Sequence, residues 1–208
     1  TEVILHGWNR WGEDCLRHFD GMFAFALWDP RDRSLLLARD RLGKKPLYYA
    51  ALPDGLCLFG SELKALAAHP ALPRELDAEA VADFFAYGYV PDPKSIYRAA
   101  RKLPPGHFLR WRRGGAPALR QWWDLPLDDT RGDAADVVAQ LEAATRRRLI
   151  ADVPLGAFLS GGVDSSAVVS QMAAATAEPV KTFAIGFGDG AWDETAYARA
   201  VADRYGTE

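Results

Sequence analysis

The sequence has little of several features that would assign a protein to a broad class. Its 208 residues include only two cysteines, Cys15 and Cys57, whose spacing fits neither a metal site nor a disulfide framework. Lys and Arg number 25 against 28 Asp and Glu, so no basic excess exists to bind a phosphate backbone, and we expect no nucleic-acid partner. The longest apolar runs, such as residues 22–28, are far shorter than the roughly 20 residues of a membrane helix, so we expect no membrane partner.

The first residues also lack the charged and apolar regions of a secretory signal, and they lack a starting Met. We interpret Cys15 and Cys57 as small core residues, which fits a reducing compartment, and we expect a cytoplasmic protein. Hydrophobic residues make up 49% of the chain and charged residues 25%, which excludes a disordered or low-complexity chain. The composition therefore predicts a folded protein with a sizeable core.

Short apolar runs bounded by turn-forming residues dominate the first part of the chain. The expected strands are 22–28, 34–38, 46–50, 55–59, 107–112 and 118–123. Their spacing is typical of hairpins, and their continuous apolar character predicts cover on both faces. We expect two short helices within residues 1–19 and a helix over 62–68 capped by Ser61. A further helix begins after Asp77, with Val81, Phe84 and Phe85 facing inward. This pattern favours a sandwich of sheets covered by helices.

The pattern changes after a segment rich in Asp, Pro and Gly, residues 124–133, which is the best linker candidate. The expected elements beyond it are a helix over 134–150, a strand over 154–159, a helix over 164–175, a strand over 180–187 and a helix from Asp193. Helices that alternate with almost wholly apolar strands predict a parallel sheet with crossover helices. We therefore expect an α+β domain over 1–123 and the start of an α/β domain over 134–208.

The most informative motif is Ser160–Ser166 (SGGVDSS), which lies between an expected strand and an expected helix. Its two adjacent glycines let backbone amides turn inward, and the first turn of the following helix offers unpaired amides and a positive dipole end. Three serine hydroxyls add donors, so a polyphosphate would fit. Asp164 alone would repel that anion, and its presence indicates a bridging Mg²⁺. The alternative is a plain turn capped by Asp164. The motif lacks the lysine of kinase and GTPase phosphate loops.

The motif resembles the pyrophosphate-binding loop of the ATP-pyrophosphatase superfamily, and the chain as a whole resembles the glutamine-hydrolysing asparagine synthetases. The blocks that carry this resemblance are Asp20–Asp29, Ala38–Tyr49, Gly60–Leu66, Leu103–Gly106, Trp123–Asp124 and Asp152–Ser166. The resemblance implies that residues 1–123 are the later part of an amino-terminal-nucleophile glutaminase domain, an αββα sandwich. It implies that residues 134–208 begin a parallel-sheet ATP-pyrophosphatase domain of the adenine nucleotide alpha hydrolase-like kind.

The family resemblance implies a reaction. Glutamine hydrolysis supplies ammonia, which displaces AMP from a β-aspartyl-adenylate, so the products include asparagine and pyrophosphate. ATP and Mg²⁺ are the implied cofactors, with aspartate, glutamine and ATP as small-molecule partners. A homodimer is compatible with the resemblance, and the sequence leaves the oligomeric state open.

The same resemblance implies a set of site residues. The implied nucleotide-binding residues are Leu159, Ser160, Gly161, Gly162, Val163, Asp164, Ser165, Ser166 and Ile185. Asp164 is also the implied magnesium ligand. For Leu159 and Ile185, packing in the core is the alternative interpretation.

The chain departs from the family pattern at both ends. The family's glutaminase nucleophile is an amino-terminal cysteine, whereas Thr1 aligns with a segment deep inside that domain, so neither Thr1 nor Cys15 is assigned as a nucleophile. The later catalytic residues of the synthetase domain would lie beyond Glu208. We therefore expect an internal fragment that holds no catalytic residue and is inactive alone.

Several alternatives to asparagine synthesis stay open. They are a β-lactam synthetase-like cyclase, an amidotransferase of polysaccharide or secondary metabolism, and a non-catalytic ATP-binding module.

Two further groups of residues have structural interpretations. The charged residues Arg39, Asp40, Arg41, Lys44 and Lys45 are expected to form a solvated ion-pair turn. Trp122 and Trp123, which stand beside the expected linker, are interpreted as a packing wedge between domains.

Overall fold

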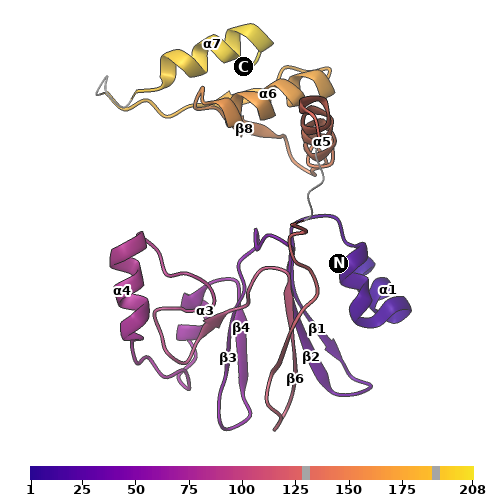
Figure 1. Ribbon diagram of the computed structural model, residues 1–208, viewed down its shortest axis with the longest axis vertical. Helices are drawn as coiled ribbons and strands as arrows, with labels where there is room; N and C mark the ends of the chain where they lie inside the picture. Colours follow the sequence, from indigo (N-terminus) through magenta and orange to yellow (C-terminus); the bar gives the residue numbers. More distant parts are fainter. Residues whose placement is uncertain (128–131, 189–192) are drawn as a thin grey trace. The chain divides into compact units, whose positions relative to one another are not determined.

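A computed structural model describes residues 1–127, 132–188 and 193–208 (Figure 1). The chain divides into two compact units, Thr1–Leu127 and Asp128–Glu208. Residues 128–131, which belong to the expected linker 124–133, lie outside the described residues. Within the described ranges, no helix has both the length and the apolar character that crossing a membrane requires.

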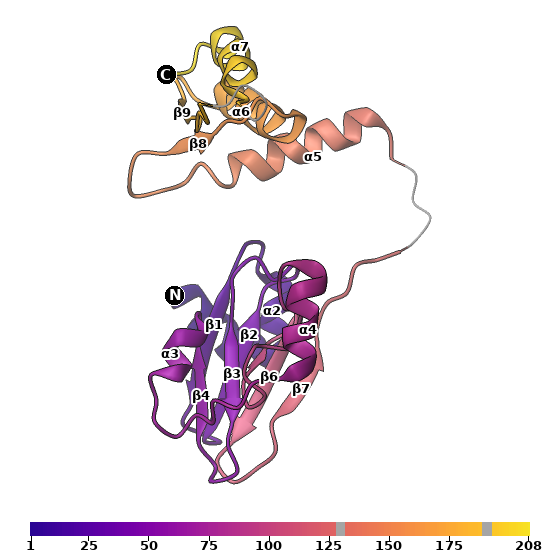
Figure 2. The same cartoon turned by 90° about the vertical axis from the view of Figure 1, so that its left-hand side faces the viewer.

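Within residues 1–127, the strands form two antiparallel sheets (Figure 2). The first sheet has the order β1-β2-β6-β7, with bounds Ala24–Asp29, Ser34–Arg39, His107–Arg112 and Ala118–Gln121. The second has the order β4-β3-β5, with bounds Cys57–Gly60, Tyr48–Ala51 and Arg101–Lys102. The expected hairpins β1–β2, β3–β4 and β6–β7 are confirmed. β2 and β3 belong to different sheets, so the chain passes from one layer to the other between them.

Alternation along β2 explains how both faces of the first sheet are covered, because successive strand side chains point to opposite faces. Leu36 belongs to a core cluster with Leu16, which lies on the helical side formed by α1 (Glu2–Trp11), η1 (Gly12–Asp14) and α2 (Cys15–His18). Leu37 packs instead with Leu47 and Leu103, next to the second sheet. All six residues of β2 are buried as a result.

The second sheet is covered on its other face by helix α3 (Leu63–Ala67), where Leu66 packs with Ala50 of β3. The order of layers in this unit is therefore helix, sheet, sheet and helix, as expected for an αββα sandwich. The N-cap of α3 is Glu62, which makes no side-chain cap bond, so the expectation that Ser61 caps this helix is wrong.

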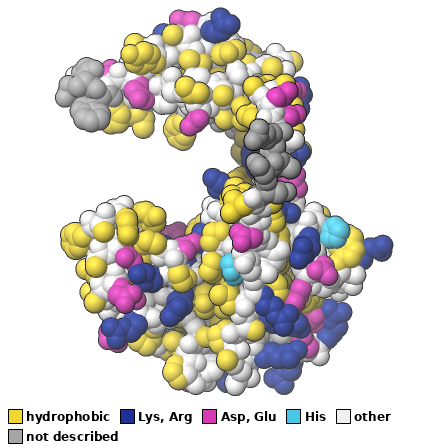
Figure 3. All heavy atoms as spheres, viewed as in Figure 1, with side chains coloured by type: hydrophobic (Ala, Val, Ile, Leu, Met, Phe, Trp, Pro, Cys, Tyr) yellow, Lys and Arg dark blue, Asp and Glu magenta, His cyan; other side chains and the backbone are white. Residues whose placement is uncertain are grey.

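Helix α4 (Ala78–Tyr87) begins where the sequence indicates, but the side chains it buries are not the expected ones. Asp77 accepts hydrogen bonds from the backbone nitrogens of Glu79 and Ala80, which confirms it as the N-cap. Ala80 is the buried residue of this helix, whereas Phe84 and Phe85 are 50% and 83% exposed, so the inward orientation expected for them is wrong. Apolar residues occur on several sides of α4, and periodicity therefore defines no single core face. Hydrophobic side chains gather on the surface over this helix (Figure 3).

The charged turn after β2 is also different from its expected form. Arg39 and Asp40 are only 8% and 2% exposed. Asp40 accepts hydrogen bonds from the backbone nitrogens of Phe23, Lys44 and Lys45. Arg39 donates to the carbonyl oxygens of Gly43, Lys45 and Leu103 and pairs with Asp92 at 2.8 Å. The expected solvated turn is wrong at these two positions, because their charges satisfy backbone groups that the fold buries.

Trp122 lies in the core of the first unit and is 6% exposed. Its indole nitrogen donates to the carbonyl oxygen of Arg39 at 3.3 Å, and its ring stacks with that of Phe23. Trp123 is partly buried against the same cluster. Trp122 is therefore part of this core, and its interpretation as a wedge between domains is wrong, whereas for Trp123 that interpretation stays a prediction.

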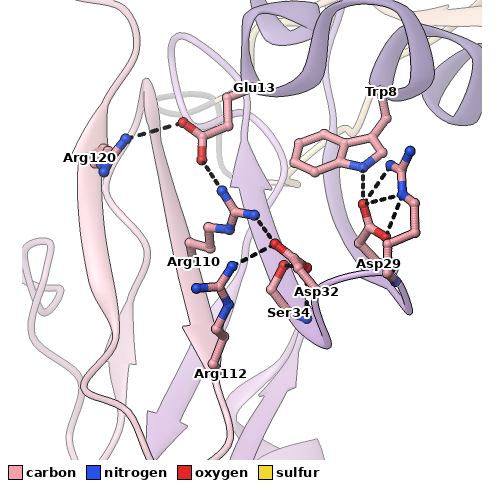
Figure 4. A network of polar contacts seen from close by, with 9 residues as sticks. Trp8, Glu13, Asp29, Asp32, Ser34, Arg110, Arg112 and Arg120 are labelled. Carbon is pink, nitrogen blue, oxygen red and sulfur yellow. Dashed lines mark hydrogen bonds and ion pairs between the residues drawn. The ribbon is translucent and has the colours of Figure 1, made fainter.

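A network of charges joins η1 to the first sheet (Figure 4). Glu13 accepts from Arg110 at 3.1 Å and from Arg120 at 3.3 Å. Asp32, in the β1–β2 turn, pairs with Arg110 and with Arg112. Each guanidinium in β6 therefore has a carboxylate partner, which holds the helical layer and the turn to the same edge of the sheet.

The second unit contains the parallel strands β8 (Gly156–Phe158) and β9 (Lys181–Phe183), with Ala157 opposite Thr182. Its helices are α5 (Ala134–Arg146), α6 (Val163–Ala175) and α7 (Thr195–Tyr205). Because α6 connects the two parallel strands, the expected crossover is confirmed. The core of this unit contains Leu159 together with residues of α6 and α7.

The end of the chain returns to the edge of β9. The backbone nitrogen of Glu208 donates to Val180 at 3.0 Å, and that of Thr182 donates to Glu208 at 2.6 Å. Residue 183 bonds instead toward β8, through a hydrogen bond from Leu159 to Phe183. Since alternate residues of a strand direct their backbone groups to opposite edges, Glu208 lies along the edge of β9 opposite β8.

Candidate nucleotide-binding site

A cavity of about 360 Å³ opens at the carboxyl ends of β8 and β9. The residues that line it are Phe158, Leu159, Ser160, Ser165, Phe183, Ala184, Ile185, Phe187 and Glu194. Ligands of open α/β sheets bind at the carboxyl ends of the strands. Four of the residues implicated by the sequence, Leu159, Ser160, Ser165 and Ile185, therefore meet around one cavity.

The backbone of the Ser160–Ser166 loop depends on glycine at one position. Gly161 has a φ of +80°, which side chains rarely allow. A Cβ atom on Gly161 would also lie 2.5 Å from the Cβ of Tyr197. The loop after β8 thus passes directly over the first turn of α7, and only glycine fits this approach.

Helix α6 begins without a side-chain cap. Its N-cap is Gly162, which is extended and has no side chain to accept a hydrogen bond from the first turn. Asp164 lies within that first turn, is exposed and makes no cap bond to the helix. The alternative of a plain turn needs Asp164 as the cap, so the structure does not support it. The first-turn amides and the positive end of the helix dipole are therefore available to an anion.

Serine hydroxyls line the same turn. The Oγ atoms of Ser160 and Ser165 lie 3.0 Å apart, and Ser160 Oγ accepts from the nitrogen of Gly162 at 3.3 Å. The Oγ of Ser166 is a buried atom that makes no hydrogen bond within the described residues. A buried hydroxyl without a partner is costly, so this position favours an added acceptor.

The other residues implicated by the sequence have different places. Gly161, Gly162, Val163, Asp164 and Ser166 belong to the loop and α6 but are not among the residues that line the cavity. Leu159 is buried in the core of the unit, so its packing role accompanies its place at the cavity. Ile185 is 67% exposed and is not a core residue within the described parts of the chain.

The donor set at the loop fits a magnesium ion only when a phosphate supplies further ligands. Among the described residues, no group of three or more His, Cys, Asp or Glu side chains is placed to hold a metal. Asp164 offers one exposed carboxylate at the start of α6. Magnesium commonly binds through one or two carboxylates together with substrate phosphates. Asp164 therefore suits a metal that arrives with a nucleotide.

Glu194 and three phenylalanines line the cavity and were not implicated by the sequence. The phenylalanines are Phe158, Phe183 and Phe187. No sequence pattern singled out Glu194, which lies well beyond the end of β9 at the start of a helix. In the sequence, the phenylalanines belong to apolar runs like those of any buried strand. An apolar run does not show whether its side chains line a cavity or pack in the core.

The two thiols are not candidates for a nucleophile. Burial, with a smaller contribution from the charge of Asp14, raises the pKa of Cys15 to about 11. Burial alone raises the pKa of Cys57 to about 11. Because the thiolate is the reactive form, both residues act as core side chains, as expected.

Comparison with known families gives two matches. Residues 1–123 match the model of a glutamine amidotransferase domain, and residues 136–208 match the model of asparagine synthase. The chain belongs to the glutamine-hydrolysing asparagine synthetase family. The two antiparallel sheets of its first unit are consistent with the glutaminase fold of that family.

Curated members of the asparagine synthetase family match along most or all of this chain. Asparagine synthetase [glutamine-hydrolyzing] 3 of Bacillus subtilis is 38% identical over 174 residues, which are 82% of this chain and 28% of that protein. A putative asparagine synthetase 2 of Methanocaldococcus jannaschii is 38% identical over 217 residues, covering 100% of this chain and 42% of that protein. Asparagine synthetase [glutamine-hydrolyzing] 2 of Arabidopsis thaliana is 36% identical over 220 residues, which are 99% of this chain and 32% of that protein. The chain thus spans less than half the length of these relatives.

Proposed function

We propose that this protein takes part in the ATP-dependent synthesis of asparagine from aspartate, with ammonia supplied by glutamine hydrolysis through a β-aspartyl-AMP intermediate. The observation that carries the proposal is the cavity at the carboxyl ends of two parallel strands, lined by Ser160 and Ser165 beside the uncapped start of α6. The family membership of both parts of the chain supports the same reaction. Relatives named asparagine synthetases support aspartate as the acceptor.

In this proposal, the pyrophosphate end of ATP occupies the Ser160–Ser166 loop. Backbone amides of the first turn of α6 and the serine hydroxyls donate to phosphate oxygens, and the helix dipole favours their charge. Magnesium, held by Asp164 and the phosphates, would neutralise the charge that develops on the departing pyrophosphate.

The adenosine end of ATP would lie toward the second strand. Leu159 and Ile185 line that side of the cavity, and Ile185 exposes an apolar side chain there. The proposed nucleotide-binding set is Leu159, Ser160, Gly161, Gly162, Val163, Asp164, Ser165, Ser166 and Ile185.

We also propose that residues 1–123 belong to the glutaminase domain, that 124–133 are a linker and that 134–208 belong to the synthetase domain. A cytoplasmic location is part of the proposal, which the two free cysteines support.

Nucleotide binding by the 208-residue chain tests the proposal directly. Isothermal titration with ATP and Mg²⁺ should give measurable affinity, and AMP, which lacks the pyrophosphate, should bind at least tenfold more weakly. We expect no pyrophosphate release from this chain alone. Absence of ATP binding at millimolar concentrations would overturn the proposal.

A matched pair of serine variants tests the location of the site. Ser165 lines the cavity, whereas Ser170, one helical turn and a half further along α6, donates to the carbonyl oxygen of Ala167. Ser165→Ala should weaken ATP binding about tenfold, as expected for one hydrogen bond to a charged group, and Ser170→Ala should not. Equal losses from both variants would contradict binding at the loop.

A further inference from the structure

We propose that the carboxylate of Glu194 accepts hydrogen bonds from the ribose hydroxyls of the bound nucleotide, so that this residue selects ribonucleotides. The inference rests on the proposed function, because it requires ATP in the cavity described above. Glu194 lines that cavity together with Ser160, Ser165 and Ile185. Among the described residues that line the cavity, Glu194 alone has a charged side chain. The other side chains are apolar or are serine hydroxyls.

The position of Glu194 in the cavity indicates which part of the nucleotide it meets. In the proposed function, the phosphates lie at Ser160 and Ser165, and the base lies against Ile185. The ribose connects phosphates and base, so it must lie between those two ends of the cavity. Glu194 begins α7, whose first turn packs against the loop at Gly161. Because Glu194 lines the cavity from the start of α7, we assign its carboxylate to the ribose, the part of the nucleotide that joins these two ends.

The backbone of Glu194 is held, but its side chain is available. Its carbonyl oxygen accepts from the nitrogens of Tyr197 and Ala198, each at 3.1 Å, which fixes the residue at the start of α7. The hydrogen bond from the nitrogen of Thr195, at 2.9 Å, goes to Oδ1 of the neighbouring Asp193 and not to Glu194. Within the described residues, the carboxylate of Glu194 has no hydrogen bond or ion pair. No group of the described residues therefore competes with a ligand for this carboxylate.

The chemistry of a carboxylate selects the ribose among the parts of ATP. An ionised carboxylate is an acceptor only, so it needs donors. Phosphate groups are anionic acceptors and would be repelled, whereas the 2′- and 3′-hydroxyls are neutral donors. In dinucleotide-binding folds, an acidic residue about 20 residues after the glycine-rich turn binds the ribose 2′-hydroxyl by the same chemistry. Hydrogen bonds to a charged acceptor are also stronger than neutral ones, which suits discrimination between sugars.

Affinities for ATP and for 2′,3′-dideoxy-ATP, which lacks both hydroxyls, test this assignment. The wild-type chain should bind ATP about tenfold or more tightly than the dideoxy analogue. Glu194→Ala should bind both ligands with the same affinity, close to that of the wild type for the analogue. Glu194→Gln keeps one acceptor oxygen and should retain part of the preference. Glu178→Gln, which removes an exposed acid outside the cavity lining, should keep the full preference.

The outcomes separate this inference from the proposed function. If the wild type binds no ATP, the proposed function fails. If it binds ATP but shows no preference over the analogue, or if Glu194→Ala keeps the preference, the ribose assignment is wrong while the nucleotide site stands. If Glu194→Ala weakens both ligands equally and only when Mg²⁺ is present, the carboxylate binds the metal, and the assignment to the ribose is likewise overturned.

Discussion

A Cβ atom on Gly161 would lie 2.6 Å from the backbone nitrogen of Ala198. This approach joins the loop that follows β8 to the helix that follows β9, and both segments contribute residues to the same cavity. Two separate pieces of sequence thus form one site because a glycine lets their backbones meet. The site should therefore be sensitive to a single added methyl group at this position.

Gly161→Ala should abolish ATP binding and destabilise the second unit. The added Cβ meets backbone atoms of α7, which cannot move aside as a flexible side chain would, and the φ of +80° is strained for alanine. Gly206→Ala is the control, since Gly206 has a φ of +62° but no neighbouring atom within 4 Å of its Cβ position. It should cost only about 1–2 kcal/mol of backbone strain. Thermal unfolding and ATP titration measure both effects, and similar losses in the two variants would contradict the close approach.

Asp164→Asn should weaken ATP binding in the presence of Mg²⁺ but not in the presence of EDTA. The reason is that the carboxylate is proposed to act through the metal, and the amide is a poorer ligand of similar shape. In an assembled synthetase that contains these residues, the same change should abolish adenylate formation and spare glutamine hydrolysis. Titrations with and without the metal provide the measurement. An equal loss under both conditions would mean that Asp164 supports the loop rather than magnesium.

Acid should destabilise the first unit through Asp32. Hydrogen bonds from Ser34 and Arg112, with the nearby Arg110, lower the pKa of Asp32 from 3.8 to about 2. A lowered pKa in the folded state means that the charged carboxylate contributes stability above pH 3.8, and that this contribution disappears as the pH falls toward 2. Asp32→Asn should therefore be less stable at neutral pH and should lose less stability over that interval. Chemical denaturation at several pH values measures this dependence.

The control for Asp32 is Glu75→Gln, because Glu75 forms an exposed ion pair with Arg98. Exposed pairs contribute little, so this variant should follow the wild type at every pH. If Asp32→Asn has the same pH dependence as the wild type, the charge network of Figure 4 does not stabilise the fold.

Leu37→Ala should destabilise the first unit by about 2–5 kcal/mol, because it leaves a cavity between the two sheets. Leu37 is fully buried there and packs with Leu47 and Leu103. Leu42→Ala removes the same atoms from a side chain that is 62% exposed and should change the free energy of unfolding by less than about 0.5 kcal/mol. Urea denaturation compares the two. A small effect at Leu37 would mean that the sheets are not packed through this residue.

Both cysteines should react only slowly with a thiol reagent at pH 8 while the protein is folded. With both pKa values raised to about 11, only about one thiol in a thousand is a thiolate at that pH. Cys15 is fully buried and should react more slowly than the partly buried Cys57. Ellman's reagent measures both rates, and denatured protein, in which both thiols should react at once, is the control. Fast labelling of folded Cys15 would contradict its place in the core.

Much of the local structure followed from the sequence. Hairpins over β1–β2 and β6–β7, the N-cap at Asp77 and the turn between β8 and α6 depend on residues that are near one another in the chain. Turn-forming residues and side-chain periodicity act over a few neighbouring residues, so they can be recognised in the sequence without knowledge of the tertiary structure. The Ser160–Ser166 motif could be assigned to a strand-to-helix turn for the same reason.

The sequence by itself therefore determined most of the elements, though not β5 (Arg101–Lys102), and the turn between β8 and α6. It also indicated that the pattern of elements changes near residues 124–133. Only the tertiary structure decided that Arg39 and Asp40 are buried, that Phe84 and Phe85 face outward, and that Glu194 faces the cavity. Each of these depends on which distant segments pack together, as Arg39 does with Leu103 and Asp92. Burial is a property of such long-range contacts, and no local preference of a residue specifies it.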